Sequence, residues 1–233
     1  MQTVARLVLA LVALAATAAA PARVGAQVAD SGSFRITIEG RDAGTEDFVI
    51  VQSGAGTAGE QSATSRVRLR LPDGTRELDT RLTTRGISAD PVEYQVQVGG
   101  TSPGRLVGTI GGGRVSARIV TPTGEQLREY VASRGAVVLE DPVAHHYYFL
   151  AQRAHQQRVP VIVPRENRQV MAEVENRGEE RIRVGDTEAV LFHLVVRPQG
   201  GVERHLWVDA LNRVVRVDIP ARGYRAERTR VPR

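Results

Sequence analysis

The sequence predicts a mainly β protein of the α+β type, in which an antiparallel sheet packs on one helix. Three observations lead to this fold class. Apolar and polar residues alternate over most of the chain, short turns rich in Gly, Pro and Asp separate the alternating segments, and one segment at about residues 142–156 has helical spacing instead. Alternation with a period of two marks strands that bury one face, and short turns join antiparallel neighbours.

The first residues predict an export signal rather than part of the fold. A positive charge at Arg6 precedes the apolar run at residues 7–20, and small residues lie just before Gln27. This is the order of regions in a secretory signal, and the run is shorter than the ~20 residues that span a bilayer. We therefore expect a signal peptide at residues 1–26 and a single β-rich domain at residues 27–233. The protein would be periplasmic or secreted, and not an integral membrane protein.

Composition excludes several kinds of chemistry. The chain has no Cys, and its 31 basic residues, all Arg, stand against 26 acidic ones. Disulfides, thiol catalysis and a phosphate-binding loop, which needs Lys, are therefore excluded. A mildly basic exported domain is a poor nucleic-acid binder, so we expect no nucleic-acid partner.

The glycines of residues 54–59 have the spacing of a dinucleotide-binding fingerprint. Strand alternation resumes at Arg66, however, so we expect a hairpin loop here and no cofactor.

The alternating segments define the expected strands in order. They lie at residues 34–38, 45–52, 66–71, 78–82, 92–98, 115–120, 159–163, 169–175, 181–184, 189–196, 205–209 and 213–219, with a further strand ending near residue 110. Residues 124–133 fit a helix and a strand equally well. The segment at residues 189–196 is apolar at almost every position, so both of its faces are candidates for burial.

One helix is expected at about residues 142–156. Asp141 can cap it and Pro142 suits its first turn. Apolar residues then recur at helical spacing, at Val143, Tyr147, Leu150, Ala151 and Ala154. We expect an amphipathic helix of about four turns whose apolar face packs on the sheet.

Histidines and carboxylates give weak signals for a site. His145 and His155 are about 15 Å apart along a helix at 1.5 Å per residue, so they cannot share an ion. His193 and His205 lie on neighbouring strands, and a register that puts both on one face would let them hold a metal with one carboxylate. We expect ordinary strand histidines and no metal site. Paired acids such as Glu140-Asp141 are interpreted as turn and cap residues, and no catalytic residue is expected.

The C-terminal segment carries a resemblance. His205-Leu206-Trp207-Val208-Asp209 is followed by a strand at residues 212–217 and by Pro220 and Gly223. This pattern resembles the closing hairpin of uncharacterised exported bacterial proteins, and residues 34–44 are similar to their first hairpin. These families are similar in architecture to the lipoprotein-carrier (LolA-like) half-barrel. The resemblance implies a curved antiparallel sheet, or half-barrel, packed on a central helix, and it implies no catalytic residues.

These observations favour a non-enzymatic periplasmic protein of the cell envelope. An apolar or lipid-like ligand would bind between sheet and helix, against Tyr147, Leu150, Phe192 and Trp207. One alternative is an interaction module that binds an anionic envelope component through a surface formed by Arg222, Arg225 and Arg228. The other alternative is a hydrolase or metalloenzyme.

Overall fold

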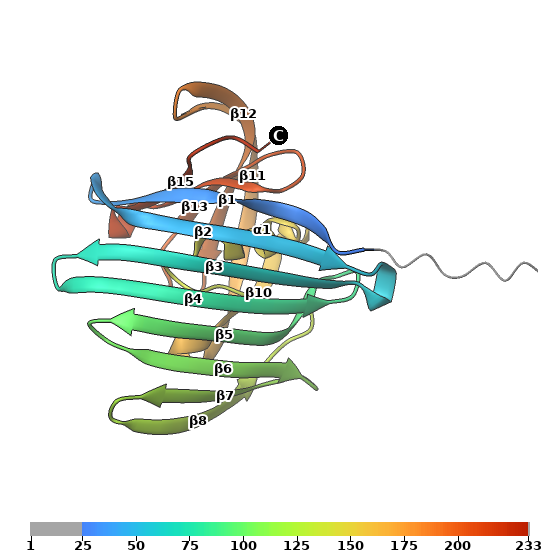
Figure 1. The fold of residues 1–233 in the computed structure, drawn as a ribbon. Coiled ribbons are helices and arrows are strands. Elements are labelled where there is room, and N and C mark those ends of the chain that lie inside the picture. The colour runs from blue at the N-terminus through green and yellow to red at the C-terminus, as the bar shows by residue number, and fades with distance from the viewer. Residues whose placement is uncertain (1–24, 233) are drawn as a thin grey trace, which may run out of the picture.

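The computed structural model describes residues 25–232. Residues 1–24 of the predicted signal peptide lie outside this range. The described chain forms one sheet of fifteen strands (Figure 1). The first eight are β1 (Gln27–Ile38), β2 (Arg41–Ser53), β3 (Glu60–Leu71), β4 (Gly74–Arg85), β5 (Asp90–Gly100), β6 (Gly104–Gly111), β7 (Arg114–Thr121) and β8 (Gly124–Val131). The others are β9 (Val137–Val138), β10 (Arg158–Val163), β11 (Arg168–Val184), β12 (Thr187–Pro198), β13 (Arg204–Val208), β14 (Val214–Ile219) and β15 (Tyr224–Arg228).

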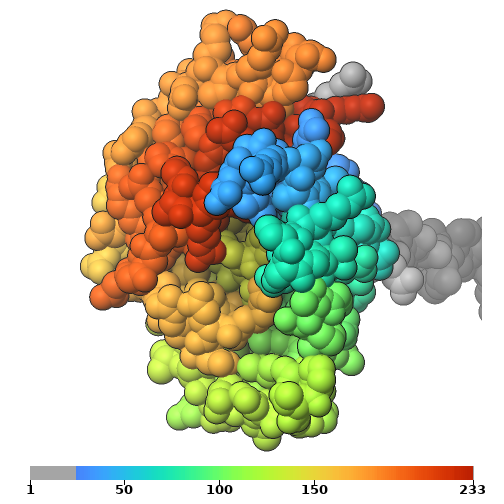
Figure 2. All heavy atoms as spheres, turned by 90° about the vertical axis from the view of Figure 1, so that its left-hand side faces the viewer, coloured from blue at the N-terminus to red at the C-terminus, as the bar shows by residue number. Residues whose placement is uncertain are grey.

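Strand order explains why the sheet curls. The chain meanders outward from β1 to β8 and returns from β9 to β15, and β15 pairs with β1 in the middle of the sheet. The two edge strands, β8 and β9, are therefore consecutive in the chain and are joined only by residues 132–136. So short a link holds the two edges close, and the sheet bends until β9 lies against β5. Figure 2 shows the blue to green first half and the orange to red second half side by side around one end of the molecule.

Side-chain alternation places a core on each face of the sheet. The main core lies on the concave face and includes Phe34, Ile50, Leu78, Leu82 and Leu206. A small second cluster covers part of the other face, where β11 to β14 lie, and consists of Ile182, Val184, Leu191, Trp207 and Val215. Burial on both sides explains why the β12 sequence is almost continuously apolar. The expected antiparallel, mainly β sheet is confirmed, with β9–β10 as a parallel pair.

The prediction of a four-turn helix at residues 142–156 is wrong. The structure has a short helix, α1 (Tyr147–Ala151), with single 3₁₀ turns at Ala144–His146 and Ala154–Gln156. Every residue from Val143 to Ala151 is buried, so the segment has no solvated face and is shaped by the sheet around it. Contacts of this kind override local propensity in a segment too short to be a stable helix on its own.

The structure also decides two assignments of secondary structure that the sequence pattern left open. Residues 124–131 form strand β8 and not a helix, and the glycine-rich loop at residues 54–59 joins β2 to β3. Among residues 25–232, no helix has the length and apolar composition needed to cross a bilayer.

Candidate functional site

A buried polar pair anchors the helical segment to the sheet. Glu46, on β2, has no exposed surface. Its carboxylate accepts the backbone N–H of Ala144 at 2.6 Å and of His145 at 3.2 Å, and it lies 2.6 Å from Nδ1 of the His145 ring. Burial raises the pKa of Glu46 to about 8 and lowers that of His145 to about 3. The pair therefore holds one proton at neutral pH and fastens the start of the segment.

Unpartnered polar atoms surround this pair. Nε2 of His145, both ring nitrogens of His146, the hydroxyl of Tyr94 and Oε2 of Glu140 are all buried without a hydrogen-bond partner among the described residues. Burial lowers the pKa of His146 and raises that of Tyr94. Such atoms usually bond to internal water. Glu140 differs from the others in this group because it also lines a cavity.

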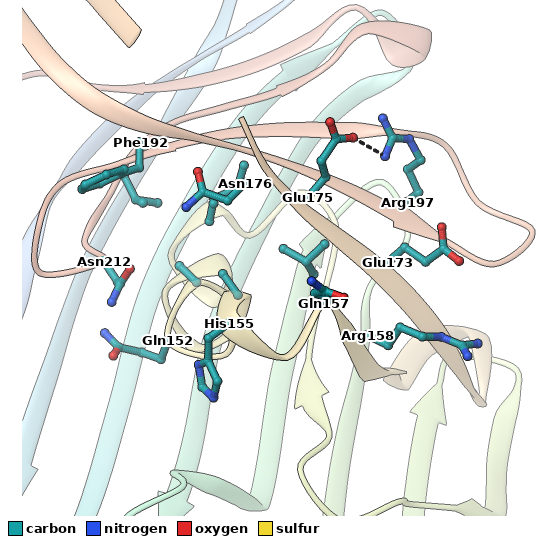
Figure 3. Close-up of a pocket in the computed structure, with 15 residues that line it drawn as sticks. Gln152, His155, Gln157, Arg158, Glu173, Glu175, Asn176, Phe192, Arg197 and Asn212 are labelled. Atoms are coloured by element: carbon teal, nitrogen blue, oxygen red, sulfur yellow. Dashed lines mark hydrogen bonds and ion pairs between the residues drawn. The ribbon is translucent and has the colours of Figure 1, made fainter. Parts of the chain in front are cut away.

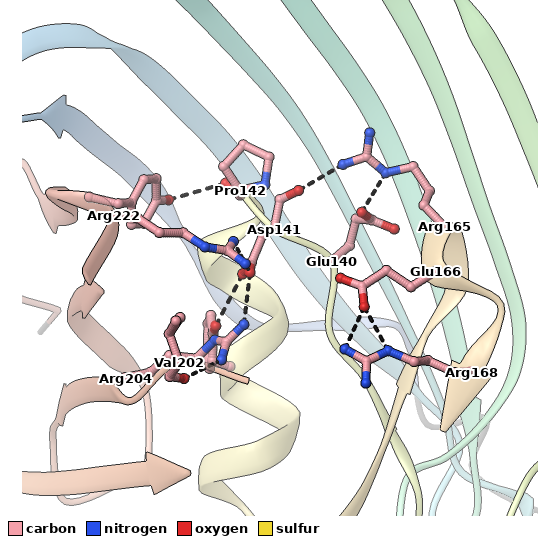
Figure 4. Close-up of polar contacts among 11 residues, drawn as sticks. Glu140, Asp141, Pro142, Arg165, Glu166, Arg168, Val202, Arg204 and Arg222 are labelled. Atoms are coloured by element: carbon pink, nitrogen blue, oxygen red, sulfur yellow. Dashed lines mark hydrogen bonds and ion pairs between the residues drawn. The ribbon is translucent and has the colours of Figure 1, made fainter. Parts of the chain in front are cut away.

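That cavity, which we call the arginine cavity, opens where the Glu140–Pro142 turn meets β10 and β13 (Figure 4). It holds about 500 Å³. Its lining combines four arginines and three carboxylates with apolar residues: Arg165, Arg168, Arg204, Arg222, Glu140, Asp141, Glu166, Leu139, Val161, Val163, Val170, Pro198, Gly200, Gly201 and Val202. A cavity of this size and mixed lining is typical of a small-molecule site.

Two arginines share one carboxylate in this cavity. Oδ2 of Asp141 accepts Nη2 of Arg204 at 2.8 Å and Nη1 of Arg222 at 2.6 Å, and Oδ1 accepts the hydroxyl of Tyr147 at 3.3 Å. Nη1 of Arg204 donates to the Val202 carbonyl, and its Nε, buried, has no partner. Figure 4 shows both guanidinium groups converging on Asp141. The pair thus carries more positive charge and more donors than its own carboxylate satisfies.

The opposite wall is closer to neutral. Nε of Arg165 donates to Glu140, its Nη2 donates to the Asp141 carbonyl at 2.7 Å, and Arg168 pairs with Glu166. Burial raises the pKa of Glu140 to about 7, so this carboxyl is partly protonated at neutral pH. Four arginines against three carboxylates leave the cavity with a net positive charge, and protonation of Glu140 increases it.

A second, larger cleft of about 840 Å³, which we call the helix cleft, lies between the helical segment and strands β11 and β12 (Figure 3). Phe192, Leu194 and Val174 are among its apolar residues, and uncharged amides are frequent: Gln152, Gln157, Asn176 and Asn212. The charged residues that line it include Glu175 and Arg197, which pair with each other at 2.8 Å. This cleft lacks the excess positive charge and the unpartnered buried donor of the arginine cavity.

The four predicted ligand residues do not line one pocket. Tyr147 and Leu150 are buried in the main core, and Phe192 packs against that core and lines the helix cleft. Trp207 belongs to the cluster on the opposite face. The register explains the split, because Phe192 pairs with Val208 and the next residue, His193, pairs with Trp207. Adjacent positions on a strand face opposite sides.

The three arginines predicted to form an anionic-partner surface are also separated. Arg228 is not on the surface, since only 2% of its side chain is exposed and it pairs with Asp30. Arg225 is exposed and forms a two-bond pair with Asp218. Arg222 lines the arginine cavity. The prediction of one exposed surface is wrong for Arg228, because its strand position turns it inward to aromatic rings, and Arg222 meets a cavity that the sequence did not indicate.

The predicted histidine pair does share a face. His193 and His205 are diagonal neighbours on β12 and β13, and Nε2 of the first lies 2.9 Å from Nδ1 of the second. No group of three or more metal-ligating side chains occurs within residues 25–232. His155, by contrast, lies exposed in the helix cleft.

The arginine cavity was missed because its residues are scattered over the sequence. Asp141 is 63 residues from Arg204 and 81 from Arg222. No local motif encodes such a distance. The one available signal was the Glu140-Asp141 pair, which we interpreted as turn and cap residues.

Comparison with known proteins supports the fold alone. No family model matches the chain, and no curated protein matches it. Among solved structures, the chain is similar to a protein described as "Beta-barrel-like Protein of Domain of Unknown Function DUF1849 from Brucella abortus". The match has 11% sequence identity and a TM-score of 0.51, and it covers 84% of this chain and 94% of the other. The chain therefore has the fold of an uncharacterised β-barrel-like protein.

Proposed function

We propose that the protein is a non-enzymatic binding protein of the cell envelope, and that its arginine cavity takes an amphipathic anion. The ligand would carry a carboxylate or phosphate group next to a short apolar part. One observation carries this proposal: two guanidinium groups converge on the single carboxylate of Asp141 at a partly apolar cavity.

The charged part of the ligand would bind at Arg204 and Arg222. Asp141 holds both side chains in place before any ligand arrives, which lowers the entropy cost of binding. The Arg222 side chain is 47% exposed, so its remaining donors are accessible, and Arg204, 10% exposed, adds its positive charge beside it. Guanidinium groups bind carboxylates and phosphates through parallel hydrogen bonds.

The apolar part of the ligand would lie against Val161, Val163, Val170 and Leu139, which line the same cavity. Burying apolar area there is worth about 25 cal/mol per Å². An apolar ligand, first predicted between sheet and helix, fits better here, because the space around Tyr147 and Leu150 is filled by the core. The export signal expected at residues 1–26 would bring the protein to the lipid- and polymer-rich envelope.

Non-enzymatic binding is the simpler function for this geometry. The carboxylate–imidazole pair of Glu46 and His145 is fully buried and serves as an anchor for the helical segment. In the cavity itself, the acidic groups are engaged by arginine side chains. Neither place offers an accessible nucleophile beside a base, which a hydrolase of that type needs.

Binding is tested with octanoate and octyl phosphate as probes and octanol as the uncharged control, using calorimetry. We expect saturable binding of both anions and none of octanol. Arg222→Ala should weaken binding about tenfold or more, since a charge-assisted hydrogen bond is worth about 1.5–3 kcal/mol. Arg204→Lys should weaken it while keeping the charge. Arg225→Ala, an exposed arginine outside the cavity, is the matched control and should bind normally. Equal binding of octanol would refute the proposal.

Binding should also depend on pH through Glu140. Because its pKa is raised to about 7, the carboxyl is mostly neutral at pH 6 and mostly ionised at pH 8. The negative charge at pH 8 repels an anionic ligand, so we expect affinity for octyl sulfate, whose charge is constant over this range, to be severalfold higher at pH 6. Glu140→Gln should bind equally at both pH values. An unchanged pH dependence in that variant would rule Glu140 out as its source.

A further inference from the structure

Two histidines on the face of the sheet opposite the main core form an arrangement that the arginine cavity does not involve. His193 and His205 lie side by side, with their facing ring nitrogens 2.9 Å apart. The ring of Trp207 stacks on His193 with centroids 4.6 Å apart. The side chains of His193 and His205 are 12% and 18% exposed. The two rings thus lie against each other and beside Trp207, and both remain partly open to solvent.

Carboxylates hold the other nitrogen of each ring. Oε2 of Glu180 lies 3.0 Å from Nδ1 of His193, and Oε1 of Glu203 lies 2.9 Å from Nε2 of His205. A carboxylate accepts a hydrogen bond, so each of these outer nitrogens carries the N–H. A neutral imidazole has only one N–H. The two inner nitrogens, 2.9 Å apart, then face each other with lone pairs unless they share a proton, so either a proton or a metal ion bridges them.

We propose that His193 and His205 form a binding site for a divalent late first-row transition-metal ion, with Cu²⁺ preferred. Histidines that bind metals commonly donate the second ring N–H to a carboxylate, and both rings here are arranged so. Rotation about the Cβ–Cγ bond, a soft torsion in histidine, turns both lone pairs onto one ion. Glu180 and Glu203 also supply two negative charges that compensate the charge of the ion.

Two adjacent imidazoles with open positions suit a tetragonal ion. Square-planar or tetragonal Cu²⁺ and Ni²⁺ sites are built from nitrogen and oxygen ligands, which are here the two ring nitrogens and solvent. Cu²⁺ also binds imidazole more tightly than the other divalent ions of its row.

The site would keep open positions. Within the described residues, no third metal-ligating side chain joins the pair, so water or an external ligand would complete the coordination. A partly exposed ion with two protein ligands exchanges readily. The site therefore suits reversible uptake and release of the metal rather than a permanent structural role.

Trp207 is the single tryptophan of the chain and reports directly on the pair. We expect Cu²⁺ to quench its fluorescence in untagged protein, with saturation at one equivalent. Electron paramagnetic resonance of the loaded protein should show a tetragonal signal with coupling to two nitrogens. Zn²⁺ should compete only in excess.

Variants separate the site from general copper adhesion. His193→Gln and His205→Gln should each weaken Cu²⁺ binding at least tenfold, and Glu203→Gln, which keeps both ligands, should weaken it about tenfold. His155→Gln, at an exposed histidine elsewhere, is the control and should bind like the unaltered protein. A variant that carries both His193→Gln and His205→Gln should lose the site. If quenching does not saturate, if the resonance signal lacks coupling to two nitrogens, or if this double variant binds Cu²⁺ as tightly as the unaltered protein, the pair holds only a proton and the metal proposal fails.

Discussion

Replacing Arg228 with methionine is expected to lower the free energy of unfolding by about 3–5 kcal/mol, because it leaves a buried carboxylate without its partner. The Arg228 guanidinium bonds to Asp30, to the Ser31 carbonyl at 3.2 Å and to the Val214 carbonyl. It therefore ties β1, β14 and β15 together where the two halves of the chain join. Burial already raises the pKa of Asp30 despite this cation, so loss of the arginine leaves the carboxyl more destabilised. Urea unfolding at pH 7 measures the effect.

Packing adds to the loss. The guanidinium carbon of Arg228 lies 5.4 Å from the ring centroid of Phe34 and 4.9 Å from that of Phe48. Cation–π contacts of desolvated groups reach about 2 kcal/mol. Arg228 is thus a core residue in spite of its charge.

Arg225 provides the matched control, three residues earlier on the same strand. Its pair with Asp218 has good two-bond geometry but is half exposed on the arginine side. Exposed pairs contribute about 0–1 kcal/mol, so Arg225→Met should have a small effect. A double variant, Asp30→Ala with Arg228→Met, should be more stable than Arg228→Met alone, since no buried charge remains. Equal losses from Arg225→Met and Arg228→Met would contradict the buried-pair interpretation.

The buried pair of Glu46 and His145 should give stability a defined pH window. With pKa values of about 8 and about 3 in the folded state, the pair holds one proton between those limits. In the unfolded chain the same groups have ordinary values of 4.5 and 6.5. They then hold two protons below pH 4.5, one proton up to pH 6.5 and none above it.

The sign follows from these proton numbers. Between pH 4.5 and 6.5 both states bind one proton, and the contribution of the pair is constant. Above pH 6.5 the folded state binds one proton more, so stability falls as pH rises towards 8. Below pH 4.5 the unfolded state binds one more, so stability falls as pH falls towards 3. Each loss spans about 1.5 pH units, or about 2 kcal/mol at 1.36 kcal/mol per unit.

Comparison with Glu46→Gln isolates this contribution. Glutamine keeps the side-chain shape and an oxygen acceptor for the backbone N–H groups of Ala144 and His145 but does not titrate. Urea unfolding at pH 6 and pH 8 should show the unaltered protein losing about 2 kcal/mol more than the variant on the alkaline side. Parallel stability curves for the two proteins would show that Glu46 does not carry a raised pKa.

Much of the sheet could be predicted because strand signals are local. Alternation of apolar and polar residues reflects which face of a strand is buried, and it correctly placed segments such as residues 66–71 and 92–98 in strands, and residues 213–219 to within one residue. The glycine-rich loop at residues 54–59 was recognised in the same way, from the strand pattern that resumes after it. A two-residue periodicity can be recognised within one segment, without knowing which strand it pairs with.

The helix prediction failed because its environment is not local. Residues 143–154 have helical spacing, but the carboxylate of Glu46, 98 residues from Ala144 in the chain, binds the start of the segment. Arg153 likewise bonds to the Ala136 carbonyl and to Asp90. These contacts select 3₁₀ turns around a short helix.

By itself, the sequence determined the mainly β class, the antiparallel meander and the absence of disulfide and thiol chemistry, because all of these follow from residue type and short-range spacing. Only the tertiary structure decided which side chains meet. A one-residue change in register exchanges the faces of a strand, and so the register put Trp207 beside His193, away from Phe192. Curling of the sheet brought Asp141 to Arg204 and Arg222, and it placed Arg228 inside the protein. These meetings depend on long-range pairing, which alternation along one strand does not encode.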